Sequence, residues 1–415
     1  MIFIYDVGIR LYTLLIALFS LKNKKAQFWL KGRKGLFELI EKSLDKNKQY
    51  SWFHFASLGE FEQGRPVLER LKSDHPNNAI VITFFSPSGY EVRKNYPLAD
   101  HVFYLPVDTK ENARRFVSLL NPKIAVFTKY EYWYHYFEAL HENKTPLYII
   151  SGIFRKEQAF FKWYGGLHRK MLQRVSYLFV QNEESKHLLS KIGIHHVTVS
   201  GDTRFDRVDL NAKNPIKIHL IEQFCNNKNV FIAGSSWPED EKLIGTLLSS
   251  LPEWKFIIAP HEVTESRIES IEKLFPNSIK FSEIQKEGHA LQTLENTQVL
   301  IIDSVGILSS IYQYGHIAYI GGGFGVGIHN TLEAAAFGLP VLIGPNYSRF
   351  MEAIELLEKG AAFSIKDSAE LKLRMNLLLK EENRLISGTA ARQYVQNHTG
   401  ATQKFLDFIY NKGIF

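Results

Sequence analysis

The sequence predicts an α/β protein with two Rossmann-like domains, each built on a parallel sheet, and with helices at its C-terminal end. The chain of 415 residues is long enough for two or three domains. Apolar runs of strand length alternate with amphipathic segments, which is typical of a parallel sheet covered by helices on both faces. The alternation begins again after a polar stretch at residues 209–218, and this restart indicates a second sheet.

The first domain is expected over residues 50–208. Its predicted strands are short apolar runs at residues 50–57, 79–85, 101–107, 123–129, 146–151, 176–181 and 196–201. Amphipathic segments at residues 109–120 and 182–191 are predicted to be helices between them.

The second domain is expected over residues 209–365. Its predicted strands lie at residues 229–236, 254–260, 297–303, 316–322 and 340–344. From about residue 366 to 415 the sequence predicts helices only. Ligands of such folds usually bind at the carboxyl ends of the strands, so we expect them in a cleft between the two domains.

The amino-acid composition excludes several kinds of site and partner. Hydrophobic residues make up 45% of the chain and charged residues 22%, which is ordinary for a folded protein. The single cysteine, Cys225, excludes an intrachain disulfide and a Cys-rich zinc site. The net charge is +7, but the basic excess is concentrated in residues 1–34, and the body of the chain lacks the basic stripes of a nucleic-acid-binding protein. We therefore expect no nucleic-acid partner.

Residues 1–49 are predicted to form a membrane-associating helix and a basic segment. In the apolar run 11–21, four leucines share one helical face, namely Leu11, Leu14, Leu15 and Leu18. The basic residues nearby are Arg10, Lys22, Lys24, Lys25, Lys31, Arg33 and Lys34, against Asp6 alone. The run 11–21 is shorter than the roughly 20 residues that span a bilayer. A helix lying on an anionic membrane surface fits better; the alternative is an ordinary first helix packed on its own domain.

The segment "YIGGGFGVGIHNTLEAAAFGLPVLIGP" (319–345) carries the strongest ligand signal. A strand runs into a glycine-rich loop, and a helix is predicted to start near His329–Asn330. Such a loop and helix start favour a phosphate. The spacing departs from the dinucleotide fingerprint, since Val326 stands where a third glycine is needed. Glu333 can accept hydrogen bonds from ribose hydroxyls; the alternatives are a tight turn and a favourable charge at a helix start.

In "FHFASLGEFEQGRPVLERL" (53–71), Ser57 and Glu60 fit the Ser-x-x-Glu capping box, in which both side chains bond free amides at a helix start. From these letters alone, a capped helix is a sufficient explanation for Glu60.

Five segments in order resemble motifs of the 3-deoxy-D-manno-octulosonic acid (Kdo) transferases of lipopolysaccharide synthesis. They are "HFASLGE" (54–60), "KYEYW" (129–133), "GDTRFDRV" (201–208), "AGSSWPEDE" (233–241) and "GIHNTLEAAAFGLPVLIGP" (327–345). Two positions depart from the family pattern. "APHEVTE" (259–265) lacks an arginine that the family often carries, and Ile328 replaces a glycine before His329.

The resemblance implies a type B glycosyltransferase fold and an inverting transfer of Kdo from CMP-Kdo to a lipid A precursor (lipid IVA). It implies that Glu60 is the general base that removes the proton from the attacking hydroxyl. The other residues that it assigns to the acceptor or to Kdo are Ser57, Gly59, Glu131 and Arg155. Those assigned to the donor nucleotide are Ser235, Ser236, His261, Gly323, Gly325, Gly327, His329, Asn330 and Glu333.

Several of these roles have simpler alternatives. Glu131 and Arg155 could be surface charges, and His54 fits a hydrogen-bonded core residue. Arg204, Asp206 and Arg207 could form ion pairs at the domain junction. No Asp-x-Asp motif is present, so we expect transfer without a metal or other cofactor.

With the basic N-terminal segment, the resemblance predicts a location on the cytoplasmic face of the cell inner membrane. Two other functions stay open. One is a transferase of the same architecture that uses a UDP-sugar. The other is a catalytically inactive membrane-surface binding protein of the same fold.

Overall fold

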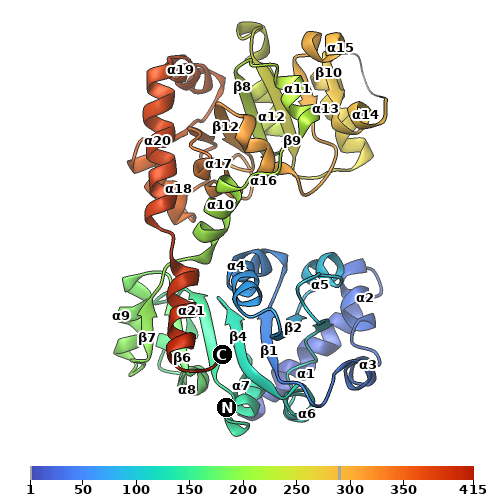
Figure 1. The fold of residues 1–415 in the computed structure, drawn as a ribbon, viewed down its shortest axis with the longest axis vertical. Helices are drawn as coiled ribbons and strands as arrows, with labels where there is room; N and C mark the ends of the chain where they lie inside the picture. The colour runs from blue at the N-terminus through green and yellow to red at the C-terminus, as the bar shows by residue number, and fades with distance from the viewer. Residues whose placement is uncertain (1, 288–290) are drawn as a thin grey trace. The chain divides into compact units, whose positions relative to one another are not determined.

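The computed structural model describes residues 2–287 and 291–415. Two compact units are present: residues 1–207 with 399–415, and residues 208–398 (Figure 1). The C-terminal segment, which the sequence analysis treated as one domain from residue 366, is therefore divided. Its last helix, α21 (Ala401–Asn411), buries Phe405 and Ile409 in the core of the first unit. The carboxylate of Asp206 also accepts hydrogen bonds from the amides of Gly400 and Thr402 at the start of this helix.

The first unit contains a parallel seven-stranded sheet in the order β3-β2-β1-β4-β5-β6-β7. The strands are β1 (Tyr50–Phe55), β2 (Ala79–Phe84), β3 (His101–Tyr104), β4 (Pro122–Thr128), β5 (Leu147–Gly152), β6 (Tyr177–Val180) and β7 (Val197–Val199). All seven predicted strands of this domain are confirmed. Both faces of β1 are buried, since Trp52 packs in the core on one side and Phe53 in the core on the other. This is why the strand reads as a continuous apolar run.

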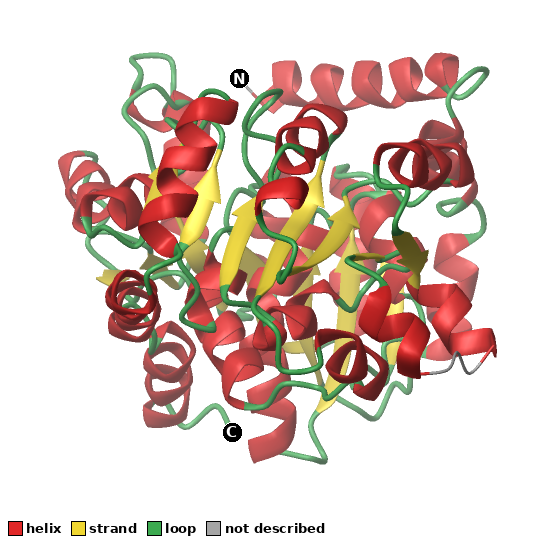
Figure 2. Ribbon diagram, turned by 90° about the horizontal axis from the view of Figure 1, so that it is seen from above, coloured by secondary structure: helices red, strands yellow, loops and turns green. Residues whose placement is uncertain are grey.

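Helices cover both faces of this sheet (Figures 1 and 2). They are α4 (Leu58–Asp74), α5 (Pro87–Arg93), α6 (Lys110–Leu120), α7 (Tyr134–Glu142), α8 (Gly166–Arg174) and α9 (Glu183–Lys191). The next helix along the chain is α10 (Thr203–Lys213). The predicted helices at 109–120 and 182–191 correspond to α6 and α9. Helix α10 begins in the first unit and continues into the second.

Three helices precede the sheet: α1 (Ile2–Phe19), α2 (Lys24–Lys31) and α3 (Leu36–Ser43). The unbroken helix α1 has 18 residues, a mean hydropathy of 1.8 and no buried residue, so by length and composition it could cross a membrane. The helix extends beyond the apolar run 11–21 on its N-terminal side, through Asp6 and Arg10. Trp29 and Ile40, from α2 and α3, are buried, so this part of the basic segment packs on the unit.

The second unit contains another parallel seven-stranded sheet, in the order β10-β11-β9-β8-β12-β13-β14. Its strands are β8 (Val230–Ser236), β9 (Lys255–Pro260), β10 (Ser278–Lys280), β11 (Val299–Ile301), β12 (Ile317–Ile320), β13 (Val341–Ile343) and β14 (Ala362–Ser364). The five predicted strands are confirmed. The sequence analysis missed β10 and β14, three-residue strands at the two edges, because "SIK" and "AFS" are too short to form an apolar run.

Ten α-helices belong to this unit within the described residues. They are α11 (His219–Cys225), α12 (Pro238–Gly245), α13 (Glu265–Leu274), α14 (Phe281–Glu287), α15 (Leu291–Asn296), α16 (Leu308–Ile311), α17 (Leu332–Ala336), α18 (Met351–Glu358), α19 (Ser368–Leu378) and α20 (Glu381–Asn397). The helix predicted near His329–Asn330 begins later, at Leu332, and has five residues. The residues just before it belong to the glycine-rich loop.

Candidate functional site

Glu60 lies in the first turn of α4, just beyond the carboxyl end of β1. Its carboxylate accepts a hydrogen bond of 2.6 Å from the amide of Ala56. Ser57 is the residue that precedes the helix, but its hydroxyl makes no capping bond. The predicted capping box is therefore wrong in its serine half, because only the glutamate reaches a free amide. Gly59 lies exposed in the same turn.

Burial, the larger cause, and the nearby charge of Glu131 together raise the pKa of the Glu60 carboxyl to about 7. The amides of Ala56 and Ser57 and the charge of Lys129 lower it, but they do not offset the burial. A carboxyl group with a pKa close to neutrality can both lose its proton before a reaction and accept one during it. This is the property that a general base needs.

Glu131 is held by a chain of hydrogen bonds that begins in the sheet. Its Oε2 accepts from His54 Nε2 at 2.9 Å and from the indole N–H of Trp133 at 2.8 Å. His54 Nδ1 lies 2.8 Å from the hydroxyl of Thr83, which accepts from the indole N–H of Trp52 at 2.8 Å. Because Thr83 accepts from Trp52, its own proton is available for His54 Nδ1, which leaves Nε2–H to donate to Glu131.

From the sequence, His54 was not expected to take part in the site, Thr83 was not singled out, and Trp133 appeared only as part of the motif "KYEYW". His54 is fully buried and hydrogen-bonded, as its apolar strand suggested. Its contact with Glu131 joins residues 77 positions apart. Only the alternation of side chains along β1, which separates His54 from Phe53 and Phe55, hinted at a distinct environment for this ring.

Cationic side chains approach from the loops that follow β4 and β5. Arg155 is exposed, and it hydrogen-bonds Tyr130, the residue before Glu131. Lys129 adopts a left-handed conformation with φ of 61° at the end of β4. A lysine rarely adopts this conformation, and such strain is concentrated at functional sites. The first unit thus brings together Glu60 from the first turn of α4 with Glu131 and Arg155 from the loops that follow β4 and β5.

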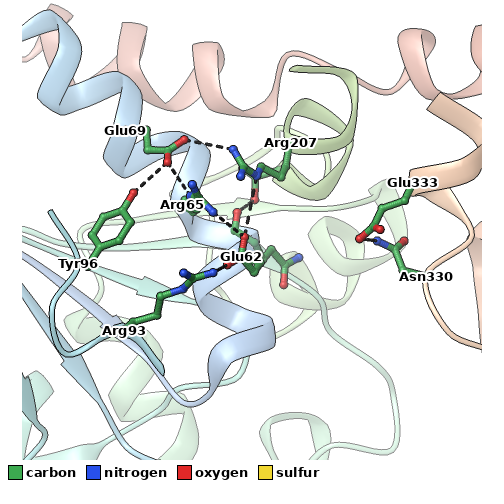
Figure 3. Close-up of polar contacts among 10 residues, drawn as sticks. Glu62, Arg65, Glu69, Arg93, Tyr96, Arg207, Asn330 and Glu333 are labelled. Atoms are coloured by element: carbon green, nitrogen blue, oxygen red, sulfur yellow. Dashed lines mark hydrogen bonds and ion pairs between the residues drawn. The ribbon is translucent and has the colours of Figure 1, made fainter. Parts of the chain in front are cut away.

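Charged side chains of α4, α5 and α10 form ion pairs with one another (Figure 3). Arg93 contacts Glu62 at 2.6 Å, and Arg65 contacts Glu69 at 2.6 Å. Arg207 from α10 lies 3.3 Å from Glu69 and 3.9 Å from Glu62. These contacts agree with the ion-pairing alternative for Arg207.

Asp206 and Arg204, also on α10, form hydrogen bonds within the first unit. Asp206 caps α21, as described above, and Arg204 Nε donates to Asp202 at 2.8 Å. These contacts agree with the ion-pairing alternative for Arg204, while Asp206 acts as a helix cap.

The glycine-rich loop of the second unit follows β12. The amides of Gly325 and Gly327 both donate to the carbonyl of Gly322, and the amide of His329 donates to that of Gly321. The loop's own turns thus use the amides of Gly325 and Gly327, and the assignment of these glycines to the donor site stays a prediction. Gly323 lies so close to Gly344 that an added Cβ would be 2.6 Å from its backbone. The glycines permit close packing of the loop.

Other predicted donor-site residues lie on three adjacent strand ends. His261 follows β9 and stacks on His329 with ring centroids 4.3 Å apart. Glu333 Oε1 accepts from the side-chain amide of Asn330 at 3.1 Å (Figure 3). Ser235 has a positive φ of 51° at the end of β8.

Ser236 is buried, and its hydroxyl donates to Glu241 at 2.7 Å. Glu241 in turn pairs with Arg267. The Ser236 hydroxyl is thus committed to an internal network and is not presented to a nucleotide in this structure.

Metal ions in proteins are bound mainly by His, Cys, Asp and Glu side chains. Within residues 2–287 and 291–415, no group of three or more His, Cys, Asp or Glu side chains could hold a metal ion. The expectation of metal-independent chemistry stays a prediction.

Replacing Glu131 by Gln is expected to lower the pKa of Glu60, because the substitution removes a negative charge that disfavours ionisation. The expected shift is about one pH unit. A ¹³C NMR titration of the Glu60 carboxyl measures it without any substrate. Glu138→Gln, on α7 of the same unit, is the matched control and should leave the titration unchanged. An unaltered Glu60 titration in Glu131→Gln would contradict the electrostatic coupling.

The sequence comparisons agree with the motifs. Residues 30–207 match the family model described as 3-deoxy-D-manno-octulosonic-acid transferase (kdotransferase). The 3-deoxy-D-manno-octulosonic acid transferase of Haemophilus influenzae is 27% identical over 376 residues, which cover 86% of this chain and 86% of that protein. The corresponding transferase of Aquifex aeolicus is 28% identical over 357 residues, covering 83% and 91%.

Among solved structures, the UDP-GlcNAc 2-epimerase of Neisseria meningitidis bound to UDP-GlcNAc superposes with a TM-score of 0.62 at 17% identity, covering 88% of this chain and 100% of that one. At this identity the likeness concerns the fold alone. Together with the two parallel seven-stranded sheets, it confirms the predicted type B glycosyltransferase architecture. The matches support a glycosyltransferase, and by its sequence the chain is similar to the 3-deoxy-D-manno-octulosonic acid transferases.

Proposed function

We propose that this protein transfers Kdo from CMP-Kdo to a lipid A precursor, lipid IVA, with inversion at the anomeric carbon. The observation that carries the proposal is Glu60, a carboxyl group with a pKa raised to about 7 at the end of a central strand. An inverting transfer needs one base that removes the proton of the attacking hydroxyl, and Glu60 has both the protonation behaviour and the position, in the first turn of α4, for it.

Around Glu60, the neighbouring groups have separate tasks. Glu131 keeps the pKa of Glu60 raised, so that the base is strong enough to accept the proton during attack. Arg155 is exposed near Tyr130, and its planar guanidinium suits a carboxylate of Kdo or a phosphate of the acceptor. Ser57 and Gly59 shape the turn that carries the base.

The second unit is proposed to bind the CMP moiety of the donor. His261 and His329 offer stacked rings beside the glycine-rich loop, and Glu333 offers a carboxylate for the ribose hydroxyls. When Kdo is transferred, CMP is released as the leaving group. Hydrogen-bond donors at this loop can stabilise the negative charge of its phosphate.

The proposal is tested by incubating the full chain with CMP-Kdo and a tetraacylated lipid A precursor and by measuring the mass of the product. Addition of one or more Kdo residues supports it. Transfer from a UDP-sugar in place of CMP-Kdo would favour the alternative function, a transferase of the same architecture that uses a UDP-sugar. Absence of transfer, with retained binding to lipid vesicles, would favour a binding protein.

We also propose that the protein lies on the cytoplasmic face of the inner membrane, with α1 along the bilayer surface. The polar side of α1 is held by the first unit: Tyr5 donates to the buried Asp108, and Asp6 contacts His135 at 2.6 Å. Tyr12 stacks on Phe85 with centroids 6.1 Å apart. A helix bound to its unit at both of these places favours a surface position over crossing. Its exposed apolar side chains include Phe3, Ile4, Val7, Leu11, Leu14 and Leu18.

Replacing Lys22, Lys24 and Lys25 by Glu is expected to weaken binding to anionic vesicles strongly, since each basic residue near such a surface contributes about 1 kcal/mol. Vesicle cosedimentation measures the effect. A matched triple change of exposed lysines in the second unit, Lys273, Lys359 and Lys372 to Glu, should have little effect. Equal loss in both variants would indicate attraction by overall charge only, and no loss in either would remove the basic segment from membrane binding.

A further inference from the structure

Trp237 and His329 form a flat, hydrogen-bonded pair of rings at the strand ends of the second unit. Trp237 stands between β8 and α12, and His329 ends the glycine-rich loop after β12. The indole N–H of Trp237 donates to His329 Nε2 at 3.0 Å. The ring planes differ by 6° with centroids 6.4 Å apart, so the two rings lie edge to edge in nearly one plane.

His261 covers one face of this pair. Its ring stacks on His329 at 4.3 Å and on Trp237 at 4.9 Å, with interplanar angles of 25° and 20°. The backbone beneath the rings is tied to the sheet, because the amide of His261 donates to the carbonyl of Ser236. The His329 ring is therefore held along one edge and over one face.

The buried carboxylate of Asp240 joins the two segments that carry the pair. It accepts hydrogen bonds of 2.9 Å from the amide of Trp237 and of 2.9 Å from the amide of Gly322. It also accepts one of 2.6 Å from the hydroxyl of Tyr319. One fully buried group thus connects the start of α12 to the glycine-rich loop. The distance between Trp237 and His329 is consequently determined by the fold.

The hydrogen bond determines which nitrogen of His329 carries the proton. An indole N–H can only donate, so Nε2 must accept and cannot be protonated. Burial and the neighbouring His261 lower the pKa of His329 to about 4, so the ring is neutral at physiological pH. The one remaining proton is then on Nδ1. Among the described residues, no hydrogen-bond acceptor contacts Nδ1, and the ring is only partly buried.

We infer that Trp237 is a positioning residue that holds His329 in the Nδ1–H tautomer, so that the ring donates a hydrogen bond to an anionic oxygen of the donor substrate. The inference rests on the proposed function, in which the second unit binds CMP-Kdo. That substrate carries two anionic groups with such oxygens, the phosphate and the sugar carboxylate. A neutral N–H attracts either through a charge-assisted hydrogen bond. Without Trp237, an imidazole is free to place its proton on Nε2 instead.

The test is Trp237→Phe, which retains an aromatic ring but removes the donor N–H together with one of the two fused rings of the indole. In ¹⁵N NMR of histidine-labelled full chain, wild-type His329 should show a protonated Nδ1 and a bare Nε2; loss of the resonance in His329→Gln assigns it. Trp237→Phe should populate the Nε2–H form. Trp254→Phe, at the opposite end of β9, is the matched control and should leave the tautomer unchanged.

Binding is measured by calorimetry with CMP and, separately, with free Kdo. Weakening of CMP by roughly fivefold to tenfold in Trp237→Phe identifies the phosphate as the acceptor of the hydrogen bond, and weakening of Kdo alone identifies the carboxylate. An Nε2–H tautomer in the wild type, or unchanged tautomer and affinities in Trp237→Phe, would overturn the inference. If wild type binds neither ligand, the proposed function fails, while the NMR measurement still decides whether Trp237 sets the tautomer.

Discussion

Replacing Glu60 by Gln is expected to reduce Kdo transfer by roughly a hundredfold or more, the usual scale for the loss of a general base. Glutamine has nearly the same size as glutamate, and its amide oxygen can still accept the hydrogen bond from Ala56. The substitution therefore removes the carboxylate chemistry while it preserves the helix start. Turnover, the thermal midpoint and CMP affinity should be measured on the same preparation.

The pH dependence of the wild type adds a second measurement to this prediction. The ionised form of Glu60 is the active one, and its pKa is raised to about 7. Transfer should therefore fall as the pH decreases through 7, and this acidic limb should be absent from the residual activity of Glu60→Gln.

Glu38→Gln is the matched control for this experiment. Glu38 also lies in the first turn of a helix of the first unit, α3, but it is exposed. Its replacement should leave turnover unchanged. If Glu60→Gln has the same turnover as Glu38→Gln, Glu60 is only a residue that stabilises the start of α4.

Glu333→Ala is expected to weaken CMP binding by roughly tenfold to a hundredfold, because a hydrogen bond to a charged group contributes about 1.5–3 kcal/mol. The loss should appear mainly as a higher KM for CMP-Kdo, since the ribose lies away from the bond that breaks. Asn330 loses its carboxylate partner in this variant. Asn330→Ala should therefore be measured beside it, to separate the contact with ribose from the support of the loop.

The control for the second unit is Glu265→Ala, which removes an exposed glutamate from the first turn of α13. It should change neither the affinity for CMP nor the fold. Unchanged calorimetric affinity in Glu333→Ala would remove Glu333 from the donor site, whatever the turnover.

The central strands could be predicted from the sequence because each is an apolar run buried on both faces, as β1 is by Trp52 and Phe53. The edge strands β10 and β14 could not, since three residues carry no periodicity. The motifs also led to Glu60, Glu131 and the glycine-rich loop. Their order along the chain carried the resemblance, which the comparisons confirm.

The sequence by itself therefore determined the type of fold, the family to which the chain is similar and the positions around which a site is expected. Only the tertiary structure decided how those positions behave. The raised pKa of Glu60 depends on burial and on Glu131. The carboxylate of Glu131 is in turn held by a hydrogen bond from the ring of His54, 77 residues away. The tautomer of His329 depends on Trp237, 92 residues away. Protonation depends on hydrogen bonds and on access to water, and in a parallel sheet those partners come from strand ends that are distant along the chain.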